Sequence, residues 1–455
     1  MVTKDNPLLH ASTHPFEAFD FLALNENHYL PAFEHALNES RQRVRVIAES
    51  TTHPTFENTI EALECADERL APVQSVFGSL LHAHTSPAMQ SMAREILPKL
   101  AEYSNDIFLN EKLFNRIEIV WNDALNHAPS DPHSARGEPT AEAKRLLHNT
   151  YRAFVRNGAG LTLDKKDVLR RIDGELAVKT QLFGDHVLAA TQAFEHYTDR
   201  ESDLGGLPES ARTAARALAV ARGKGSEGWL FTLDAPSSIP VLKYAEDRAL
   251  REKIWRAQTT RATSGESDNR NLTREIAVLR HQRALLLGFE THAHYTLSER
   301  MAKNPEHVMG FLGRLLRACR GAGDRELAQV KKLAAELGLS SADFKPWDMA
   351  FYSEKYRRKM LDFDEEALRP YFKLENVLNG VFEHARRLYG LEFKLRKDLP
   401  TYHPDVAVYE VHDPKQKTGP DLDPTFAGLL YTDFFPRPNK RPGAWMTVFR
   451  DQGLA

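Results

Sequence analysis

The sequence contains 19 histidines, the residues best suited to bind a metal or transfer a proton near neutral pH. A helical zinc site for hydrolysis needs two histidines four residues apart, so that both face the metal, and a glutamate directly after the first. No His-Glu-x-x-His sequence occurs in the chain. The nearest match, from His10 to His14, has Ala11 in place of the glutamate and Pro15 directly after it. We therefore interpret it as a solvated terminal segment.

Two further histidine pairs are spaced by two residues: His82 with His84, and His292 with His294. On a helix such side chains diverge by about 200°, so each pair predicts an ordinary helix surface. Glu290 and His294 are four residues apart and could share a helix face. Two ligands do not hold a catalytic zinc ion, however, and we expect no metal site there.

Motifs of other catalytic classes are also missing. The sequence has no Gly-x-Ser-x-Gly nucleophile elbow, no Walker-type phosphate loop, and no Gly-x-Gly-x-x-Gly turn that opens a helix after a strand. Aspartate and glutamate are abundant, but the sequence alone pairs none of them into a catalytic dyad. By its own residues the chain is a helical protein without a visible active site.

The composition is that of a globular protein, with 42% apolar and 27% charged residues. Lysine and arginine total 60 and aspartate and glutamate 63, so no strong net charge attracts nucleic acid or a membrane surface. The first residues lack the apolar core of a signal peptide, and no stretch could span a bilayer. We expect a cytoplasmic protein. Cys65 and Cys319 are the only cysteines, which excludes a disulfide framework and a thiolate zinc site.

Helical apolar spacing dominates the chain and predicts a mostly α protein. Thr55 is the expected N-cap of one long helical segment, which Pro72 should kink or divide. A loop is predicted over residues 127–139 and a short strand over Trp229–Leu233. Helical segments are expected from about Pro31 and from Thr55, over Met89–Trp121, from Ala141 past Leu188 with a break at Asn157-Gly158, and over Val241–Leu287, Pro305–Leu337, Phe351–Leu361 and Leu374–Tyr389.

A small antiparallel sheet is predicted near the C-terminus, from strands around Val406–Tyr409, over Phe426–Phe435 and over Ala444–Phe449. The second run is apolar at almost every position, so it needs cover on both faces. Leaving about 300 Å² of apolar surface in water would cost about 7 kcal/mol, which is comparable to the stability of a whole domain. We therefore expect this part either to be loose or to be covered by another chain.

Runs of sequence spread along the chain share the pattern of one family. They include Pro54–Glu64, Phe154–Ala159, Leu204–Pro208, Leu279-Arg280, Leu287–Phe289, Pro346–Asp348, Pro370–Phe372, Tyr402–Val406 and Gly443–Met446. In this collinear order they resemble the thimet oligopeptidase family of zinc metallopeptidases, in particular its bacterial peptidyl-dipeptidase and oligopeptidase A members. The resemblance covers essentially the whole chain.

The resemblance implies a multi-helix ellipsoid split by a deep channel, with a small sheet beside a zinc ion. It also implies hydrolysis of peptides short enough to enter the channel. In this family the zinc-binding His-Glu-x-x-His helix follows the Gly-Ala-Trp region, and its positions would lie beyond Ala455. We expect residues 1–220 to form an N-terminal helical domain and residues 221–455 the first part of a catalytic domain without the zinc helix.

Five residues are candidates for gripping a peptide. The backbone of Gly443, Ala444 and Trp445 could pair with an extended peptide, by analogy with peptidases that bind substrate as an added strand. The alternative is that Gly443 forms a bulge and Trp445 packs in the core. Tyr402 and His403 could line the channel, but a turn before Pro404 explains them as well, and we favour the turn.

These observations predict a chain of zinc-dependent oligopeptidase or peptidyl-dipeptidase type that acts on short peptides. Because this sequence holds no catalytic residue and no zinc ligand that we can name, we expect it to be inactive alone and to bind zinc only weakly. Two alternatives stay open. One is a split peptidase completed by a second chain that carries His-Glu-x-x-His. The other is a non-catalytic scaffold that binds peptides.

Overall fold

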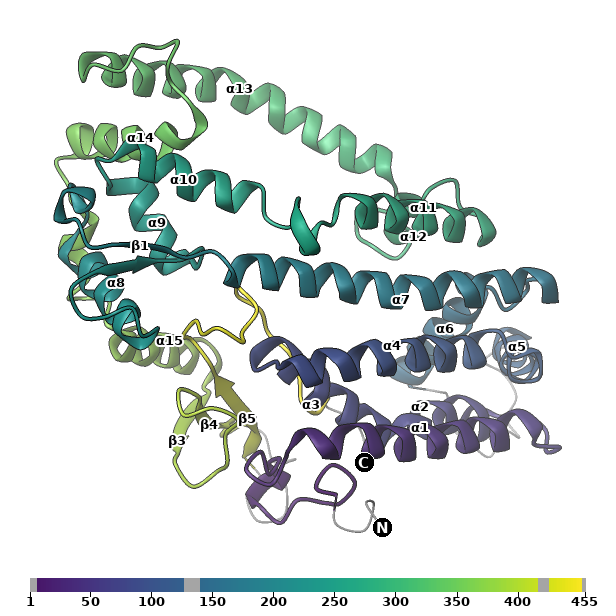
Figure 1. Cartoon of the computed structure of the whole chain (residues 1–455). Coiled ribbons are helices and arrows are strands. Elements are labelled where there is room, and N and C mark those ends of the chain that lie inside the picture. The colour runs from purple at the N-terminus through teal and green to yellow at the C-terminus, as the bar shows by residue number, and fades with distance from the viewer. Residues whose placement is uncertain (1–5, 127–139, 416–424, 452–455) are drawn as a thin grey trace.

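A computed structural model describes residues 6–126, 140–415 and 425–451, and most of them are helical (Figure 1). The mostly α class predicted from the sequence is therefore confirmed. The first seven helices are α1 (Glu26–Glu49), α2 (Ala62–Glu64), α3 (Leu70–Ala83), α4 (Pro87–Phe108), α5 (Glu111–Asn126), α6 (Ala141–Arg156) and α7 (Leu163–Gln192). They are followed by α8 (Glu209–Ala221), α9 (Ala235–Tyr244), α10 (Arg248–Thr259), α11 (Arg270–Leu286), α12 (His292–Leu297), α13 (Pro305–Glu336), α14 (Pro346–Leu361) and α15 (Leu374–Tyr389).

The long helices α1, α4 and α7 lie in successive rows, and α11 packs on the other side of α7 (Figure 1). Each helix turns an apolar face toward the next row, because apolar residues three and four positions apart lie on one side of a helix. Phe33 of α1, Val73 of α3 and Ile117 of α5 are fully buried in the resulting core. This main core is built mostly by residues before Gly160.

The segment after Thr55 is capped as predicted. The hydroxyl of Thr55 accepts a hydrogen bond from the Asn58 backbone N–H at 3.2 Å, and the Asn58 side chain accepts one from the Thr55 N–H at 2.9 Å. A π-helical turn, Phe56–Glu61, then leads through α2 and a 3-10 turn to α3. Pro72 lies in the first turn of α3, where its missing N–H breaks no helical hydrogen bond. The segment is thus divided just before the proline, as expected.

Helix α1 begins at Glu26 rather than at about Pro31. Asn25 caps it by accepting a hydrogen bond from the Asn27 backbone N–H at 3.0 Å, and Pro31 is tolerated inside the helix. The breaks predicted at Asn157-Gly158 and the helix over Pro305–Leu337 are confirmed. The loop predicted over 127–139 lies outside the described residues, and so does most of the segment 412–425.

The predicted strand at Trp229 is confirmed as β2 (Trp229–Phe231), which pairs antiparallel with β1 (His196–Thr198). A second core surrounds β2 and includes Leu204, Val241 and Ile254. This core draws residues from both sides of position 220, and the proposed domain division there stays a prediction. The deep channel stays a prediction as well. Among the described residues, no helix combines the length and apolar character that crossing a membrane requires.

The C-terminal sheet is antiparallel, as predicted, with strand order β3 (Glu392–Arg396), β4 (Ala407–His412) and β5 (Phe426–Thr432). The first two predicted strands correspond to β4 and β5. The prediction of a third strand over Ala444–Phe449 is wrong, because this segment pairs with no strand and β3 takes the third place. Its side chains hold it instead: Phe449 packs against Phe21 and Tyr431, with ring centroids 5.3 and 5.4 Å away.

Asp348 is a buried charge that joins α14 to α10. Its carboxylate has no exposed surface and accepts hydrogen bonds from Arg251 at 3.0 Å and Arg248 at 2.8 Å. Burial alone would raise its pKa, but these donors outweigh burial and hold the pKa below its usual value. Arg251 is itself 1% exposed, so the two buried charges neutralise each other.

Replacing Asp348 with alanine should lower the free energy of unfolding by about 3–5 kcal/mol, because Arg251 would stay buried without its counter-ion. Denaturant unfolding followed by tryptophan fluorescence measures the change. The control is Asp324→Ala, which removes an exposed ion pair with Arg320 on α13 and should leave stability near that of the parent chain. Equal stability of the two variants would contradict the role assigned to Asp348.

Candidate functional site

The five residues proposed to grip a peptide lie around the C-terminal end of α3. Tyr402 and His403 precede β4, and residues 443–445 follow β5. The segment after β5 is held to α3 by its backbone: Thr85 N–H donates to the Asn439 carbonyl at 2.9 Å, and Arg441 N–H to the His82 carbonyl at 2.8 Å. Residues far apart in the sequence therefore meet here.

A cluster of charged side chains around Asp433 holds this region together. The Asp433 carboxylate, whose side chain is 10% exposed, accepts two hydrogen bonds from Arg437 at 2.8 and 2.7 Å. Lys440 Nζ lies 2.8 Å from the same carboxylate, and the Tyr402 hydroxyl donates to it at 3.0 Å. Burial would raise the pKa of Asp433, but its cationic partners lower it to about 2. The carboxylate is thus ionised at neutral pH.

The cluster also ties the segment after β5 to α3. Arg437 donates a further hydrogen bond to the Ala83 carbonyl at 2.6 Å, near the end of α3. Helix ends leave carbonyl groups without helical partners, and a cation is a favourable partner there. One arginine therefore satisfies both the buried carboxylate and the end of the helix.

Tyr402 is partly buried and packs against the main core. Its ring packs edge-on against Phe21, with centroids 5.5 Å apart, and its hydroxyl points to Asp433. Burial, followed by the nearby Asp433 charge, raises the pKa of Tyr402. The hydroxyl therefore stays protonated and acts as a donor.

His403 begins the turn that the sequence favours before Pro404. Val406 N–H donates to the His403 carbonyl at 3.0 Å, and Asp405 N–H donates to His403 Nδ1 at 3.2 Å. The turn is confirmed. The imidazole ring of His403 lies 5.6 Å from that of His84 between centroids. Burial, then the charges of Arg437 and His403, lower the pKa of His84.

Residues 443–445 form an irregular segment after β5. Gly443 has a φ of 111°, in the left-handed region that favours glycine, and Gly443 and Ala444 are exposed. Because the segment is not a strand, Gly443 is not a bulge. Trp445 is half-buried, and Lys440 Nζ lies 5.9 Å from the centroid of its ring. Tyr402 therefore contacts this cluster through Asp433, and Trp445 contacts it through Lys440.

Asp433, Arg437 and Lys440 were not predicted from the sequence. The four-residue spacing of Asp433 and Arg437 is a signal of an ion pair on a helix, but Pro436 and Pro438 argue against a helix there. The pair forms in an irregular segment instead. Only the fold shows that Tyr402 completes the cluster.

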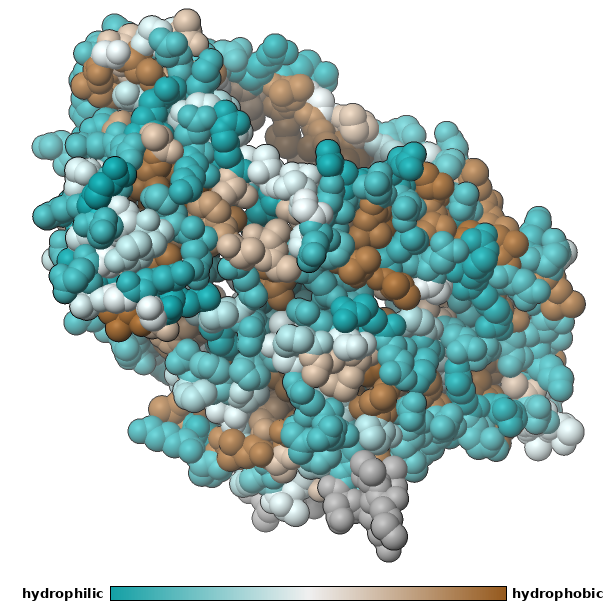
Figure 2. Space-filling view, in the orientation of Figure 1, coloured by the Kyte–Doolittle hydropathy of each residue, from teal (hydrophilic) through white to brown (hydrophobic). Residues whose placement is uncertain are grey.

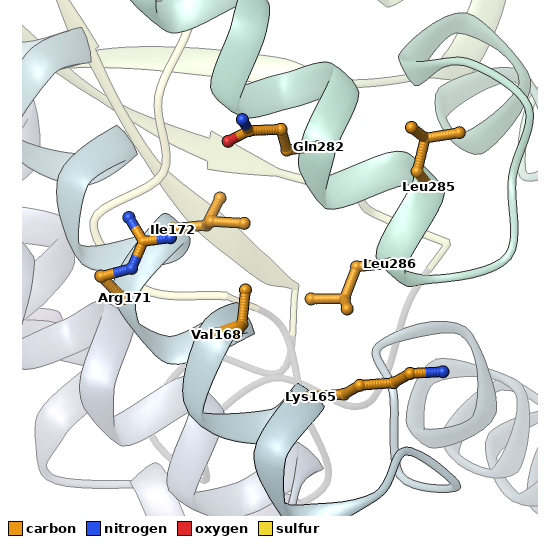
Figure 3. A pocket seen from close by; sticks show the side chains of 7 residues that line it. All are labelled: Lys165, Val168, Arg171, Ile172, Gln282, Leu285 and Leu286. Carbon is orange, nitrogen blue, oxygen red and sulfur yellow. The ribbon is translucent and has the colours of Figure 1, made fainter.

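One groove of about 480 Å³ lies between α7 and α11, away from these residues (Figure 3). Val168, Ile172 and Leu286 point into it, and Lys165 and Arg171 lie at its edge. None of the five candidate residues lines this groove. Its apolar lining offers few polar groups that could orient a substrate.

The described residues do not fit a zinc ion. No group of three or more His, Cys, Asp or Glu side chains among them could hold a metal. His294 Nε2 lies 3.7 Å from Glu290 Oε2 and 3.6 Å from Glu306 Oε1. Glu290 precedes the N-cap Thr291 of α12, so this pair does not share a helix face as proposed. His82 binds the Gly78 carbonyl of its own helix through Nδ1 at 2.9 Å. The segment from His10 to His14 is not helical.

Comparison with known proteins places the chain among peptidases. Residues 241–454 match the sequence model of peptidase family M3. Oligopeptidase A of Escherichia coli is 37% identical over 448 residues, which cover 97% of this chain and 62% of that protein. The chain belongs to peptidase family M3. The resemblance found in the sequence is thereby confirmed.

Other relatives are also matched over only part of their own length. Dipeptidyl carboxypeptidase of E. coli is 36% identical over 455 residues, or 99% of this chain and 64% of that protein. Saccharolysin of Saccharomyces cerevisiae is 25% identical over 398 residues, 85% of this chain and 53% of that protein. The chain thus spans less than two thirds of the length of these M3 relatives.

Replacing Asp433 with asparagine should lower stability at pH 6 by about 2–3 kcal/mol, since its pKa of about 2 lies well below an unfolded value of about 3.9. A depressed carboxyl pKa stabilises the fold above pH 4–5, and this contribution is lost as pH falls toward 2. The difference in thermal midpoint between parent and variant should therefore shrink from pH 6 to pH 3.

The matched control is Asp405→Asn, at a carboxylate that is 44% exposed in the nearby turn, and it should change the midpoint little at either pH. A constant difference between the parent chain and Asp433→Asn across this pH range would show that the ionised carboxylate is not what stabilises the cluster.

Proposed function

We propose that this chain forms part of a zinc-dependent peptidase that hydrolyses short peptides. The observation that carries the proposal is the match of almost the whole chain to oligopeptidase A and dipeptidyl carboxypeptidase. Both names describe enzymes that act on peptides. The near-neutral charge balance supports substrates of mixed charge over nucleic acid or an anionic membrane.

The residues that are present indicate which part of such an enzyme this chain would supply. The 455 residues contain no His-Glu-x-x-His, and the described ones hold no metal-binding group. We therefore propose that the zinc ligands and the general base belong to polypeptide outside this sequence, in the same chain or a second one. The residues described here would supply the helical frame and part of the wall that contacts the peptide.

Peptide binding is proposed for residues 443–445. Gly443 and Ala444 are exposed and lie outside any strand, so an extended peptide could pair with their backbone, and the partly buried Trp445 would anchor the segment. Tyr402 and His403 would act as positioning residues, because they are tied to the Asp433 cluster and to its turn. No described group of this chain is assigned to the bond-breaking step.

We propose a cytoplasmic location and a division into residues 1–220 and residues 221–455. Of the two alternatives, completion by additional polypeptide is favoured by the exposed apolar surface after residue 300. A non-catalytic scaffold would bind peptides without cleaving them, even after the missing polypeptide is supplied.

The 455-residue chain alone should retain no stoichiometric zinc after dialysis, and it should not cleave an internally quenched short peptide. Metal analysis and a fluorescence assay measure the two properties, with E. coli oligopeptidase A as the reference enzyme. One tightly held zinc per chain, together with hydrolysis abolished by a chelator, would overturn the proposed division of labour.

Adding a short peptide should slow hydrogen exchange at the backbone amides of Ala444 and Trp445, because pairing with an extended peptide shields these groups from water. Exchange measured by mass spectrometry on overlapping fragments tests this. The 3-10 turn Gly265–Ser267, which is remote in sequence, serves as the control and should be unchanged. Unchanged exchange at both segments under saturating peptide would refute a peptide-binding role for residues 443–445.

A further inference from the structure

Helix α13 carries an apolar stripe along its whole length, but only its C-terminal half is covered. Val330, Leu333 and Ala334 are buried, and Val330 and Ala334 belong to a core shared with α14. Leu312, Leu315 and Leu316 precede these three residues by 18 positions each, which is about five full turns of an α-helix. They therefore lie on the same face of α13. Their exposed fractions are 49%, 45% and 62%.

The lengths of the two helices explain the difference. Helix α13 has 32 residues and α14 only 16, so α14 cannot reach beyond about half of its partner. Figure 1 shows α14 under one end of α13, while the other end extends toward α12. In the space-filling view the surface is hollowed beside α13, and hydrophobic residues line the inner side of that helix (Figure 2).

Helix α15 is also covered on only one side. Phe382 stacks on Phe393 of the C-terminal sheet, with ring centroids 4.2 Å apart, so one edge of the helix is covered. Val377, Val381 and Leu388 are four and seven residues apart, which places them together on a neighbouring strip. That strip is exposed by 40%, 56% and 59%. No residue of α15 is fully buried.

Uncovered apolar surface is concentrated in one part of the described chain. Most of the large apolar side chains that are exposed by more than half of their area come after residue 300, among them Met301, Tyr371 and Met446. Most of the buried apolar side chains come before residue 300. Soluble proteins rarely leave contiguous apolar faces in water, so these faces mark a contact with another polypeptide.

We propose that the exposed face of α13, defined by Leu312, Leu315 and Leu316, is the docking surface for the polypeptide that corresponds to the unmatched part of oligopeptidase A. This rests on the proposed function. The length comparison supports this occupant: the chain aligns over 97% of its own length but reaches only 62% of the E. coli protein. The exposed strip of α15 extends the same contact.

The test co-expresses the tagged 455-residue chain with the part of E. coli oligopeptidase A that lies beyond the alignment. The double variant Leu312→Lys with Leu315→Lys places two charges on the proposed surface. Both leucines are already exposed over almost half of their area, so the free chain should keep its fold. The matched control is Leu22→Lys with Leu125→Lys, at leucines that are 80% and 64% exposed on other parts of the protein.

The parent chain and the control should each recover an equimolar complex, and the α13 variant should recover about tenfold less or none, because charges at the centre of an apolar interface are strongly unfavourable. Circular dichroism and thermal midpoints of the free chains verify that folding is unaffected. Recovery that is equal for all three, or no complex with the parent chain, would overturn the proposal. The proposal would also be overturned if the free parent chain formed a dimer and the α13 variant did not, because the occupant would then be a second copy.

Peptide hydrolysis by the recovered complex separates this proposal from the proposed function. A complex that depends on α13 but cleaves no peptide keeps the docking surface and refutes the peptidase assignment. Hydrolysis that survives in the α13 variant keeps the peptidase assignment and refutes the docking surface. Joining the two polypeptides in one chain, with the same variants, shows whether the contact also forms when it is intramolecular.

Discussion

The constraint on which this structure depends is that the apolar face of each helix must be covered. Before residue 300 the described helices meet this requirement among themselves, since rows α1, α4 and α7 cover one another and α11 covers the far side of α7. After residue 300, the first half of α13 and one strip of α15 keep apolar side chains exposed. A 32-residue helix set against a 16-residue one leaves half of its stripe in water. This imbalance, and not any lack of helical propensity, distinguishes the two parts.

The C-terminal sheet depends on a different interaction, the buried ion cluster around Asp433. A carboxylate with little contact to water is tolerated only when cations and donors surround it. Arg437, Lys440 and Tyr402 provide them, and Arg437 extends the cluster to the end of α3. The irregular segment after β5 is fixed by these contacts, and with it the exposed backbone at Gly443 and Ala444. A polar cluster therefore positions the part of the surface that is proposed to contact a peptide.

Membership in peptidase family M3 and the absence of a metal-binding group from the described residues are compatible, because the chain spans less than two thirds of its M3 relatives. A zinc hydrolase site needs three protein ligands held in fixed geometry. The two acidic side chains near His294 do not form such a site with it. The helical frame and the chemistry of such an enzyme need not come from the same residues. The described residues form a helical frame, and we propose that the zinc ligands and the general base lie in polypeptide outside this sequence.

The sequence by itself determined the helical class, the capped segment at Thr55, the division before Pro72 and the strands β2, β4 and β5. These features are local, because apolar period, caps and prolines act over a few residues. It also identified the family through collinear runs, although no single run decides it. The strand over Ala444–Phe449 was wrongly predicted, because composition shows only that a run suits a strand and not what it packs against. In the fold this segment is held by side-chain packing, with Phe449 against Phe21 and Tyr431, and not by pairing with the edge strand β5.

Only the tertiary structure decided which apolar faces find partners and which charges meet. Leu312 and Val330 follow the same helical pattern in the sequence, yet one is exposed and the other buried, because α14 ends before it reaches Leu312. Asp433 and Tyr402 are 31 residues apart and share a hydrogen bond that no local spacing announces. Contacts between distant segments depend on how whole helices and strands are arranged in space, and that arrangement is not encoded in any short stretch of the chain.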